Sequence, residues 1–286
     1  MIQFGAHAFV WIGDWTTDSG NKTIASAAAA GMDFIEIPIL DPETFDAAAH
    51  RKTLESEGIS ATFSTVLPHH SHMPENPDRA KAYLLKVLDK VAETGSEYLG
   101  GCIGYALGRL TGAPPTEAEI DNTVAGLAEI ADEAADRGIT LALEACNRYE
   151  TYMFNALEDT RAAILRTGKS NLKLHADTYH MNIEEEGFYA PIKNTADVLD
   201  YLHMSESNRG LVGSGTVWWE EIWKALSEIK FNGKLALESF AAVNPKLQAA
   251  TCLWRPTNAS PETLASEGMK FLKDGARRHG LIAAGP

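Results

Sequence analysis

The chain has 286 residues, of which 45% are hydrophobic and 22% charged, and its formal net charge is −14. That length and apolar content suffice for one large globular domain. The acidic balance disfavours nucleic acid as a partner, because binding to phosphate backbones depends on Lys and Arg. No apolar run reaches the roughly 18 residues of a membrane span, and the first residues lack a signal-peptide pattern. We therefore expect a cytoplasmic protein without membrane contact.

Short runs rich in β-branched and aromatic residues alternate with helix-like segments along the chain. Eight runs are predicted to be strands: Phe4–Val10, Asp33–Ile39, Ile59–Val66, Glu97–Gly104, Thr140–Cys146, Leu172–Asp177, Val198–Ser205 and Lys234–Phe240. Between them we predict helices that include Asp18–Ala30, Pro77–Thr94, Thr116–Arg137, Ala156–Thr167 and Trp218–Ile229. Several of these segments are predicted to end at a glycine, as is common for helices: Gly31, Gly95, Gly138, Gly168 and Gly233. The alternation is typical of a parallel sheet built from βα units.

Eight strand–helix repeats in about 250 residues predict a (β/α)8 TIM barrel. We expect it to form a single domain over residues 1–286, because no proline- or serine-rich linker divides the chain. The alternative is an open, doubly wound sheet. The segment Val10-Trp11-Ile12-Gly13-Asp14 after the first strand lacks the glycine fingerprint of dinucleotide-binding sheets, which favours the barrel.

Four ionisable residues lie at or near the ends of successive predicted strands. Glu144 lies near the end of the fifth strand, Asp177 ends the sixth, His203 lies in the seventh, and Glu238 lies near the end of the eighth. Their separations of 33, 26 and 35 residues each correspond to about one βα unit. Because barrel enzymes build their active sites at the carboxyl ends of the strands, we expect these four side chains to converge.

A divalent metal ion would explain three carboxylates and an imidazole in apolar strands. Charged side chains buried there are costly unless they are paired or bind a cation. An oxygen-rich set with a single histidine suits Mn²⁺, Co²⁺ or Mg²⁺ better than the thiolate-rich sites of structural zinc. We expect one such ion per subunit, Mn²⁺ before the others. For any one of the four residues taken alone, a salt-bridged or hydrogen-bonded polar group at a strand end is the alternative.

The segments around these positions form motifs. They are Glu144-Ala-Cys-Asn-Arg-Tyr-Glu150, Asp177-Thr-Tyr-His180-Met-Asn-Ile-Glu-Glu185, His203-Met-Ser-Glu-Ser-Asn-Arg209-Gly-Leu-Val-Gly-Ser-Gly215 and Glu238-Ser-Phe240. These motifs closely resemble those of the ketose 3-epimerase family, which includes D-tagatose, D-allulose (psicose) and L-ribulose 3-epimerases. The family belongs to the broader group of xylose-isomerase-like barrels. The resemblance runs from the first strand to Phe240 and is densest after Leu141.

The resemblance implies that the four strand-end residues bind the metal. It also implies that Glu144 and Glu238 act as the acid/base pair, which epimerises a free ketose at C3 through an enediolate whose oxygens the metal chelates. Residues matching Glu150, His180 and Arg209 contact the substrate around its carbonyl. The family is usually dimeric or tetrameric, so a homodimer or homotetramer is expected. No glycine-rich phosphate-binding loop is evident, which favours an unphosphorylated sugar as the small-molecule partner.

Three further residues are candidates for the walls of the substrate pocket. Strand alternation would place His7 on the same face as Phe9 and Trp11. Trp11 and Phe240 could form apolar walls against the sugar carbons. We therefore include His7, Trp11 and Phe240 among the predicted substrate-binding residues.

Other histidines are predicted to have no catalytic part. His69, His70 and His72 fall in a segment rich in Pro and Asn that is typical of a solvent-exposed loop, with an edge of the pocket as the alternative place for it. His50 is expected on a helix surface in contact with solvent. His175 is expected to be an interior histidine with satisfied hydrogen bonds, or to support a ligand from behind.

Several other functions remain open at this point. A similar metal site could carry out aldose–ketose isomerisation, with proton transfer between C1 and C2, or dehydration of a keto-polyol. A non-catalytic sugar-binding barrel would be expected to lack a catalytic glutamate. A relative that cleaves phosphodiesters in damaged DNA would need a basic groove, which the net charge of −14 opposes.

Overall fold

The computed structural model describes residues 2–242, 244–245, 247–255, 257 and 259–283. Eight parallel strands form a closed barrel in sequence order. The strands are β1 (Gln3–His7), β2 (Phe34–Pro38), β3 (Ser60–Val66), β4 (Tyr98–Cys102), β5 (Thr140–Glu144), β6 (Leu172–Asp177), β7 (Leu199–Ser205) and β8 (Lys234–Glu238). The last strand pairs with the first, where Gly5 lies opposite Ala236. The predicted TIM barrel is therefore confirmed.

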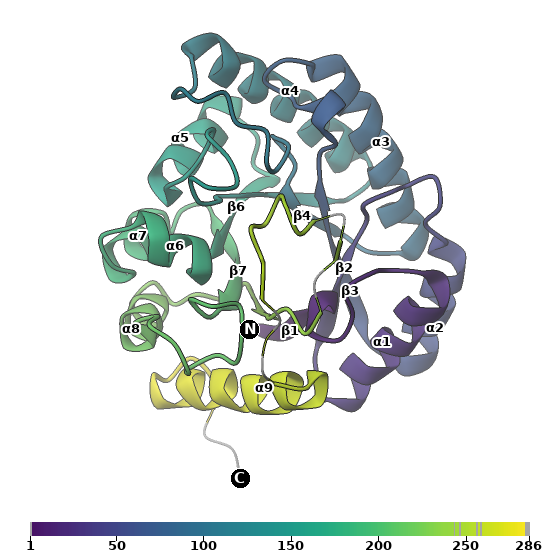
Figure 1. Cartoon of the computed structure of the whole chain (residues 1–286), viewed down its shortest axis with the longest axis vertical. Coiled ribbons are helices and arrows are strands. Elements are labelled where there is room, and N and C mark those ends of the chain that lie inside the picture. The colour runs from purple at the N-terminus through teal and green to yellow at the C-terminus, as the bar shows by residue number, and fades with distance from the viewer. Residues whose placement is uncertain (1, 243, 246, 256, 258, 284–286) are drawn as a thin grey trace.

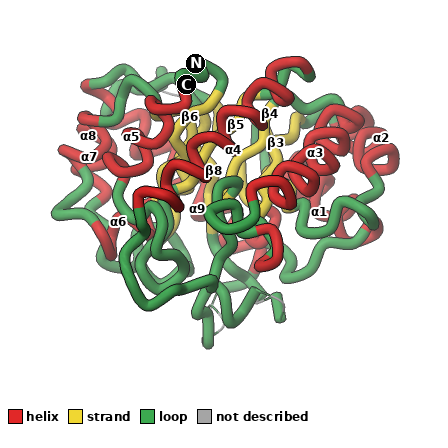
Figure 2. Tube along the Cα trace, turned by 90° about the horizontal axis from the view of Figure 1, so that it is seen from above, coloured by secondary structure: helices red, strands yellow, loops and turns green. Residues whose placement is uncertain are grey.

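Helices surround the barrel in a ring (Figure 1), and the view in Figure 2, turned by 90°, looks across the barrel with helices on the outside of the strands. They are α1 (Thr17–Ala29), α2 (Ala47–Glu57), α3 (Pro77–Thr94), α4 (Glu117–Asp136), α5 (Leu157–Thr167), α6 (Thr178–Glu184), α7 (Tyr189–Asn194), α8 (Trp219–Glu228) and α9 (Pro261–Arg278). Their apolar faces pack on the outer face of the strands to form the main core. No helix in the described part of the chain is both long and apolar enough to cross a membrane.

The elements match the predicted ones to within a few residues, with two instructive differences. β1 ends at His7, and Ala8–Val10 form a 3-10 turn in which the backbone N–H of Phe9 donates to Nδ1 of His7 at 3.1 Å. Strand alternation therefore does not extend from His7 to Trp11. Gly233 does not end a helix through a left-handed conformation. A Cβ there would lie 2.1 Å from the carbonyl oxygen of Asp200, so glycine permits a close backbone approach between β7 and β8.

Two histidines predicted to contact solvent are buried. His50 packs beneath α1, and its Nε2 accepts a hydrogen bond from Nε1 of Trp15 at 3.0 Å. His72 is also inaccessible, because its Nδ1 accepts from the backbone N–H of Ala106 at 3.1 Å. The other two histidines of that loop are exposed, as predicted.

A small apolar cluster fills the barrel beneath the carboxyl ends of the strands. Its members are Phe34, Tyr98, Ala142, Tyr201 and Ala236. Side chains two positions apart on a strand point to the same face, so the residues two positions further along also point inward. These include Glu36, Glu144, His203 and Glu238. The packed cluster thus forms a floor for the polar residues above it.

Candidate active site

Three carboxylates converge on one nitrogen of His203. The distance from Nδ1 of His203 is 3.5 Å to Oε1 of Glu238, 3.6 Å to Oε1 of Glu144 and 4.0 Å to Oδ2 of Asp177. All four side chains are buried at the carboxyl ends of β5 to β8. The convergence predicted from the spacing of these residues is therefore present in the structure.

The chemistry of this group fits a divalent cation. Nδ1 of His203 is buried and has no hydrogen-bond partner, although three acidic side chains face it. Ligand atoms of Asp177, His203 and Glu238 lie within 4.8 Å of one another, as do those of Glu144, Asp177 and His180. Three carboxylates and a neutral imidazole are suitable ligands for Mn²⁺, Co²⁺ or Mg²⁺. Burial by itself would lower the pKa of His203, but Glu238 and Glu36 raise it well above its ordinary value. Without a cation the ring therefore favours its protonated form, and a bound cation would take the place of the proton on Nδ1.

Arg209 brings a positive charge into the same group. Its Nη1 donates to Oδ2 of Asp177 at 2.7 Å and to the carboxylate of Glu238. Its Nη2 lies 3.2 Å from Nε2 of His180. The guanidinium also stacks 3.9 Å above the ring of Tyr179. These contacts hold the planar cation at the site with its nitrogens directed at the acidic residues.

A buried carboxylate anchors the loop that carries Arg209. Glu206 is inaccessible to solvent and sits at the centre of the turn after β7. It accepts hydrogen bonds from the backbone N–H groups of Ser207, Gly213 and Val217 and from Nε1 of Trp219, at 2.8 to 3.1 Å. Arg209 has φ +58°, a left-handed conformation that is unfavourable for a residue with a side chain. The anchored loop sustains that conformation and so directs Arg209 inward.

Glu150 and His180 are linked through Asn147, a residue not predicted to belong to the site. The side-chain amide of Asn147 donates to Oε1 of Glu150 at 2.9 Å, and its backbone N–H donates to Nδ1 of His180 at 3.1 Å. Since Nδ1 accepts, the proton of a neutral His180 is on Nε2, which lies 3.5 Å from Asp177. Burial, then Arg209, lowers the pKa of His180 well below its ordinary value. Burial raises the pKa of Glu150 to about 8.

A cavity of about 70 Å³ lies over this group. Its lining contains these predicted site residues: His7, Glu144, Glu150, His180, His203, Arg209, Glu238 and Phe240. Asp177 lies behind Arg209 with no solvent-accessible surface. Trp11 is half-buried, packs against the main core, and is not part of the lining.

The segment between β8 and α9 covers the cavity. In Figure 1 this yellow-green stretch crosses the centre of the ring of helices. Leu247 and Thr251 from it line the cavity, and Ala250 lies close to Gly108 of the loop after β4. The site therefore has packed strands below it and described residues of this segment along its other side.

Glu36 of β2 is a second residue that is absent from the predicted site. It is 1% exposed, and its Oε2 accepts hydrogen bonds from Nε2 of His203 at 2.7 Å and from the hydroxyl of Tyr201 at 2.6 Å. The sequence contains a signal for it, because an acidic residue interrupts the apolar run Phe34-Ile35-Glu36-Ile37-Pro38 at the end of a strand. Burial alone would raise the pKa of Glu36, but His203 and His7 outweigh that effect and lower it.

His175 also differs from its predicted environment. It is fully buried inside the barrel, as expected, but neither ring nitrogen has a hydrogen-bond partner. Its Nδ1 lies 3.8 Å from Oε2 of Glu144, and its ring packs edge-on against His203 with centroids 4.2 Å apart. Burial lowers the pKa of His175 well below its ordinary value, so it packs beneath the site as a neutral ring.

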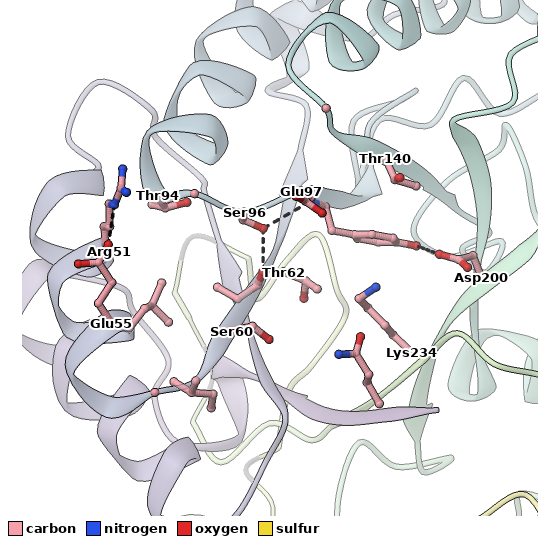
Figure 3. Close-up of a pocket in the computed structure, with 18 residues that line it drawn as sticks. Arg51, Glu55, Ser60, Thr62, Thr94, Ser96, Glu97, Thr140, Asp200 and Lys234 are labelled. Carbon is pink, nitrogen blue, oxygen red and sulfur yellow. Dashed lines mark hydrogen bonds and ion pairs between the residues drawn. The ribbon is translucent and has the colours of Figure 1, made fainter. Parts of the chain in front are cut away.

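A larger cavity lies at the opposite end of the barrel (Figure 3). It measures about 690 Å³ and is lined by residues at the starts of strands, among them Ser60, Tyr98 and Lys234. There the hydroxyl of Tyr98 donates to Asp200 at 3.0 Å, and Nζ of Lys234 lies 4.6 Å from the Tyr98 ring centre. None of the potential metal-binding groups in the described residues includes a residue of this cavity. The acidic and imidazole groups that line the smaller cavity, and not the cavity volume, therefore identify the active site.

Comparison with known proteins agrees with this site. The chain matches the family of xylose isomerase-like TIM barrels over residues 24–275. It is 37% identical to an L-ribulose 3-epimerase of Methylomonas sp. (strain DH-1) over 278 residues, which cover 95% of this chain and 97% of that protein. It is 34% identical to a ketose 3-epimerase of Arthrobacter globiformis over 279 residues, 96% of each protein.

Solved structures give the same result. The D-allulose 3-epimerase from Methylomonas sp., in complex with D-allulose, aligns with a TM-score of 0.92 and 36% identity. The alignment covers 96% of both chains. The likeness thus extends over the whole barrel, including the strand ends that carry the site.

Proposed function

The chain belongs to the ketose 3-epimerase family of xylose isomerase-like TIM barrels, and we propose that two glutamates carry out its proton transfers at C3. It is a carbohydrate epimerase, an isomerase that acts on free ketoses. The observation that carries the proposed mechanism is the meeting of Glu144, Glu238 and Asp177 around Nδ1 of His203. Similar proteins are named for L-ribulose and for D-psicose, so we propose D-allulose, L-ribulose and D-tagatose as the substrate class.

Glu144, Asp177, His203 and Glu238 would hold the metal, for which Mn²⁺ is the first candidate. When bound, the ion would offset the negative charge that develops on the substrate oxygens during proton removal. The support for this assignment is the donor set itself, in which a buried imidazole nitrogen without a partner faces three carboxylates.

The places of the two glutamates in the barrel support a role for both in inversion at C3. Glu144 ends β5 and Glu238 ends β8, so they reach the site from separate parts of the barrel wall. One removes the C3 proton from one face of the sugar, and the other donates a proton to the opposite face. Burial raises the pKa of Glu144, which favours a protonated form that can act as the acid.

Neighbouring residues would bind and orient the sugar. The Nε2–H group of His180 and the guanidinium of Arg209 would donate to the carbonyl oxygen at C2, while Glu150 would accept from a hydroxyl group. His7 accepts from Phe9 through Nδ1, so Nε2 carries the proton of a neutral ring, and this group, which contacts Oγ of Ser64 at 3.4 Å, would donate to a sugar hydroxyl in the cavity. Phe240 would form an apolar wall beside the sugar carbons.

We propose further that the protein forms a dimer or tetramer. The support is a set of large apolar side chains that are more than half exposed: Tyr149 at 60%, Trp218 at 61% and Trp254 at 65%. Exposed aromatic residues of this size are enriched in subunit contacts. Sedimentation analysis at several concentrations would test this, and a monomer at all of them would contradict it.

A labelling experiment tests the reaction. The protein would be incubated with D-allulose, L-ribulose and D-tagatose in D₂O, with added Mn²⁺, Co²⁺ or Mg²⁺ and with a chelator control. Deuterium at C3 together with the C3 epimer is the expected result. Label at C1 would indicate an aldose–ketose isomerase, and loss of water would indicate a dehydratase. No proton exchange with any ketose and metal would refute the proposal.

A further inference from the structure

Glu36 contacts His203 on the side of the imidazole away from the three carboxylates. Nε2 of His203 donates to Oε2 of Glu36 at 2.7 Å, whereas Nδ1 faces Glu144, Asp177 and Glu238. We infer that Glu36 is the positioning residue of the metal site, which keeps the proton of His203 on Nε2 and thereby presents the Nδ1 lone pair to the metal. The inference rests on the proposed role of His203 as a metal ligand.

The chemistry of imidazole leaves few alternatives for this geometry. A neutral ring has one nitrogen that carries a proton and one that can coordinate a metal. Coordination through Nδ1 requires the proton on Nε2, and a buried carboxylate is a strong acceptor for it. Glu36 accepts the hydrogen bond from Nε2–H with the same oxygen that accepts from Tyr201, so the acceptor has a defined place before the metal binds.

The surroundings hold Glu36 and the His203 ring in place. The Tyr201 hydroxyl, which donates to Glu36, also lies 3.1 Å from Oγ1 of Thr62 on β3. The His175 ring packs edge-on against His203 from below. A 180° flip of the His203 ring would put Cε1 in the place of Nε2 and Cδ2 in the place of Nδ1, so it would break the bond to Glu36 and leave no nitrogen facing the ligand carboxylates. Contacts from β2, β3, β6 and β7 therefore favour the same orientation.

Glu36 is distinct from the ligands themselves. It belongs to none of the potential metal-binding groups formed by the described residues. Its second oxygen, Oε1, is buried without a hydrogen bond, and Nε2 of His7 lies 3.7 Å from it. Its partners are thus the two histidines and Tyr201, and it acts on the metal only through His203.

Metal affinity of the whole chain provides the first test. Chelator-stripped protein would be titrated with Mn²⁺, and free Mn²⁺ would be followed by electron paramagnetic resonance. Loss of a carboxylate partner behind a ligating histidine costs about 10- to 100-fold in affinity, so we expect losses in that range for Glu36→Ala and smaller ones for Glu36→Gln. The amide oxygen of glutamine can still accept from Nε2. The matched control is Asp200→Asn, an acidic residue on the same strand as His203 but at the other end of the barrel, which should bind Mn²⁺ as the wild type does.

The proton position provides the second test, which does not depend on the folding of any Glu36 variant. Long-range ¹⁵N–¹H spectra of the wild type loaded with diamagnetic Mg²⁺ should show the His203 proton on Nε2, with the assignment made from His203→Gln. A proton on Nδ1 would overturn the inference, as would Mn²⁺ affinity within about twofold of the wild type in folded Glu36→Ala.

The outcome is separable from the test of the proposed function. Metal binding that depends on Glu36, in a protein that moves no C3 proton, would refute the epimerase mechanism and leave the role of Glu36 intact. Epimerisation by the wild type, together with a metal affinity that Glu36→Ala does not change, would refute the role of Glu36 and leave the epimerase mechanism intact. A wild-type protein that binds none of the three metals would refute both.

Discussion

Replacement of Glu238 by glutamine removes one acid/base group with little change of shape. In the wild type its Oε1 lies 3.5 Å from Nδ1 of His203, and its other oxygen contacts Arg209. Arg209 retains its hydrogen bond of 2.7 Å to Asp177 in the variant, so the buried cation is not left unpaired. We therefore expect Glu238→Gln to fold, with a thermal unfolding midpoint close to that of the wild type.

The expected effect on catalysis is large. A positioned general acid or base contributes about 10²- to 10⁴-fold, and each tenfold corresponds to about 1.4 kcal/mol of activation free energy. Loss of Glu238 should thus raise the barrier by about 3 to 5 kcal/mol from proton transfer alone. Glu144→Gln should have a similar effect, and the double variant should lose much less than the sum, because the two groups act as a unit.

Deuterium exchange is the appropriate assay for this variant. Epimer formation and label at C3 would both be measured in D₂O, with Asp200→Asn as a control of the same chemical kind at the far end of the barrel. Near-normal exchange of the C3 hydrogen in folded Glu238→Gln would refute the assignment of the two glutamates.

Three further results are expected. A chelator should abolish epimerisation, and readdition of Mn²⁺ should restore it. At about 100 times its dissociation constant, Mn²⁺ should also stabilise the fold by about 2.7 kcal/mol, measured by urea denaturation. Activity that persists in chelator would contradict a metal role. Glu206→Ala leaves several buried N–H donors without an acceptor, so it should destabilise the protein by at least about 1 to 3 kcal/mol. It should also lower activity, because the loop that directs Arg209 inward loses its anchor. Unchanged stability would show that the loop does not depend on Glu206. Burial raises the pKa of Glu150 from 4.5 to about 8, so the stability tied to its neutral form is complete below pH 4.5 and is lost as the pH rises through 8. Glu150→Gln should flatten that decline in thermal melts, and a decline identical to that of the wild type would refute it.

The fold and the convergence of four residues could be predicted because both depend on local repetition. Each βα unit places one strand end at the same rim, so Glu144, Asp177, His203 and Glu238 meet if the barrel closes. Glu36 could not be placed by the same argument. It lies 167 positions from His203, and their contact depends on two strands that face each other across the barrel interior.

Irregular backbone accounts for most of the remaining differences. The 3-10 turn after β1 interrupts the alternation that placed Trp11 beside His7. Asn147 joins Glu150 to His180 through one backbone and one side-chain donor, a pattern that depends on the turn after β5 as well as on the residue type. His50 and His72 are buried because neighbouring segments fold over them, which helix and loop patterns do not report.

The burial of the two glutamates has a consequence for the cycle of turnovers. They are only 7% and 6% exposed, beneath a covered cavity. On the proposed mechanism each turnover leaves the proton on the opposite glutamate, so the enzyme that releases one epimer is prepared to accept that epimer and not the one it has just consumed. The protein would then alternate between two isomeric forms, and its return to the first form would require proton exchange with water. At high ketose concentration that reset, and not the chemistry at C3, would limit the flux.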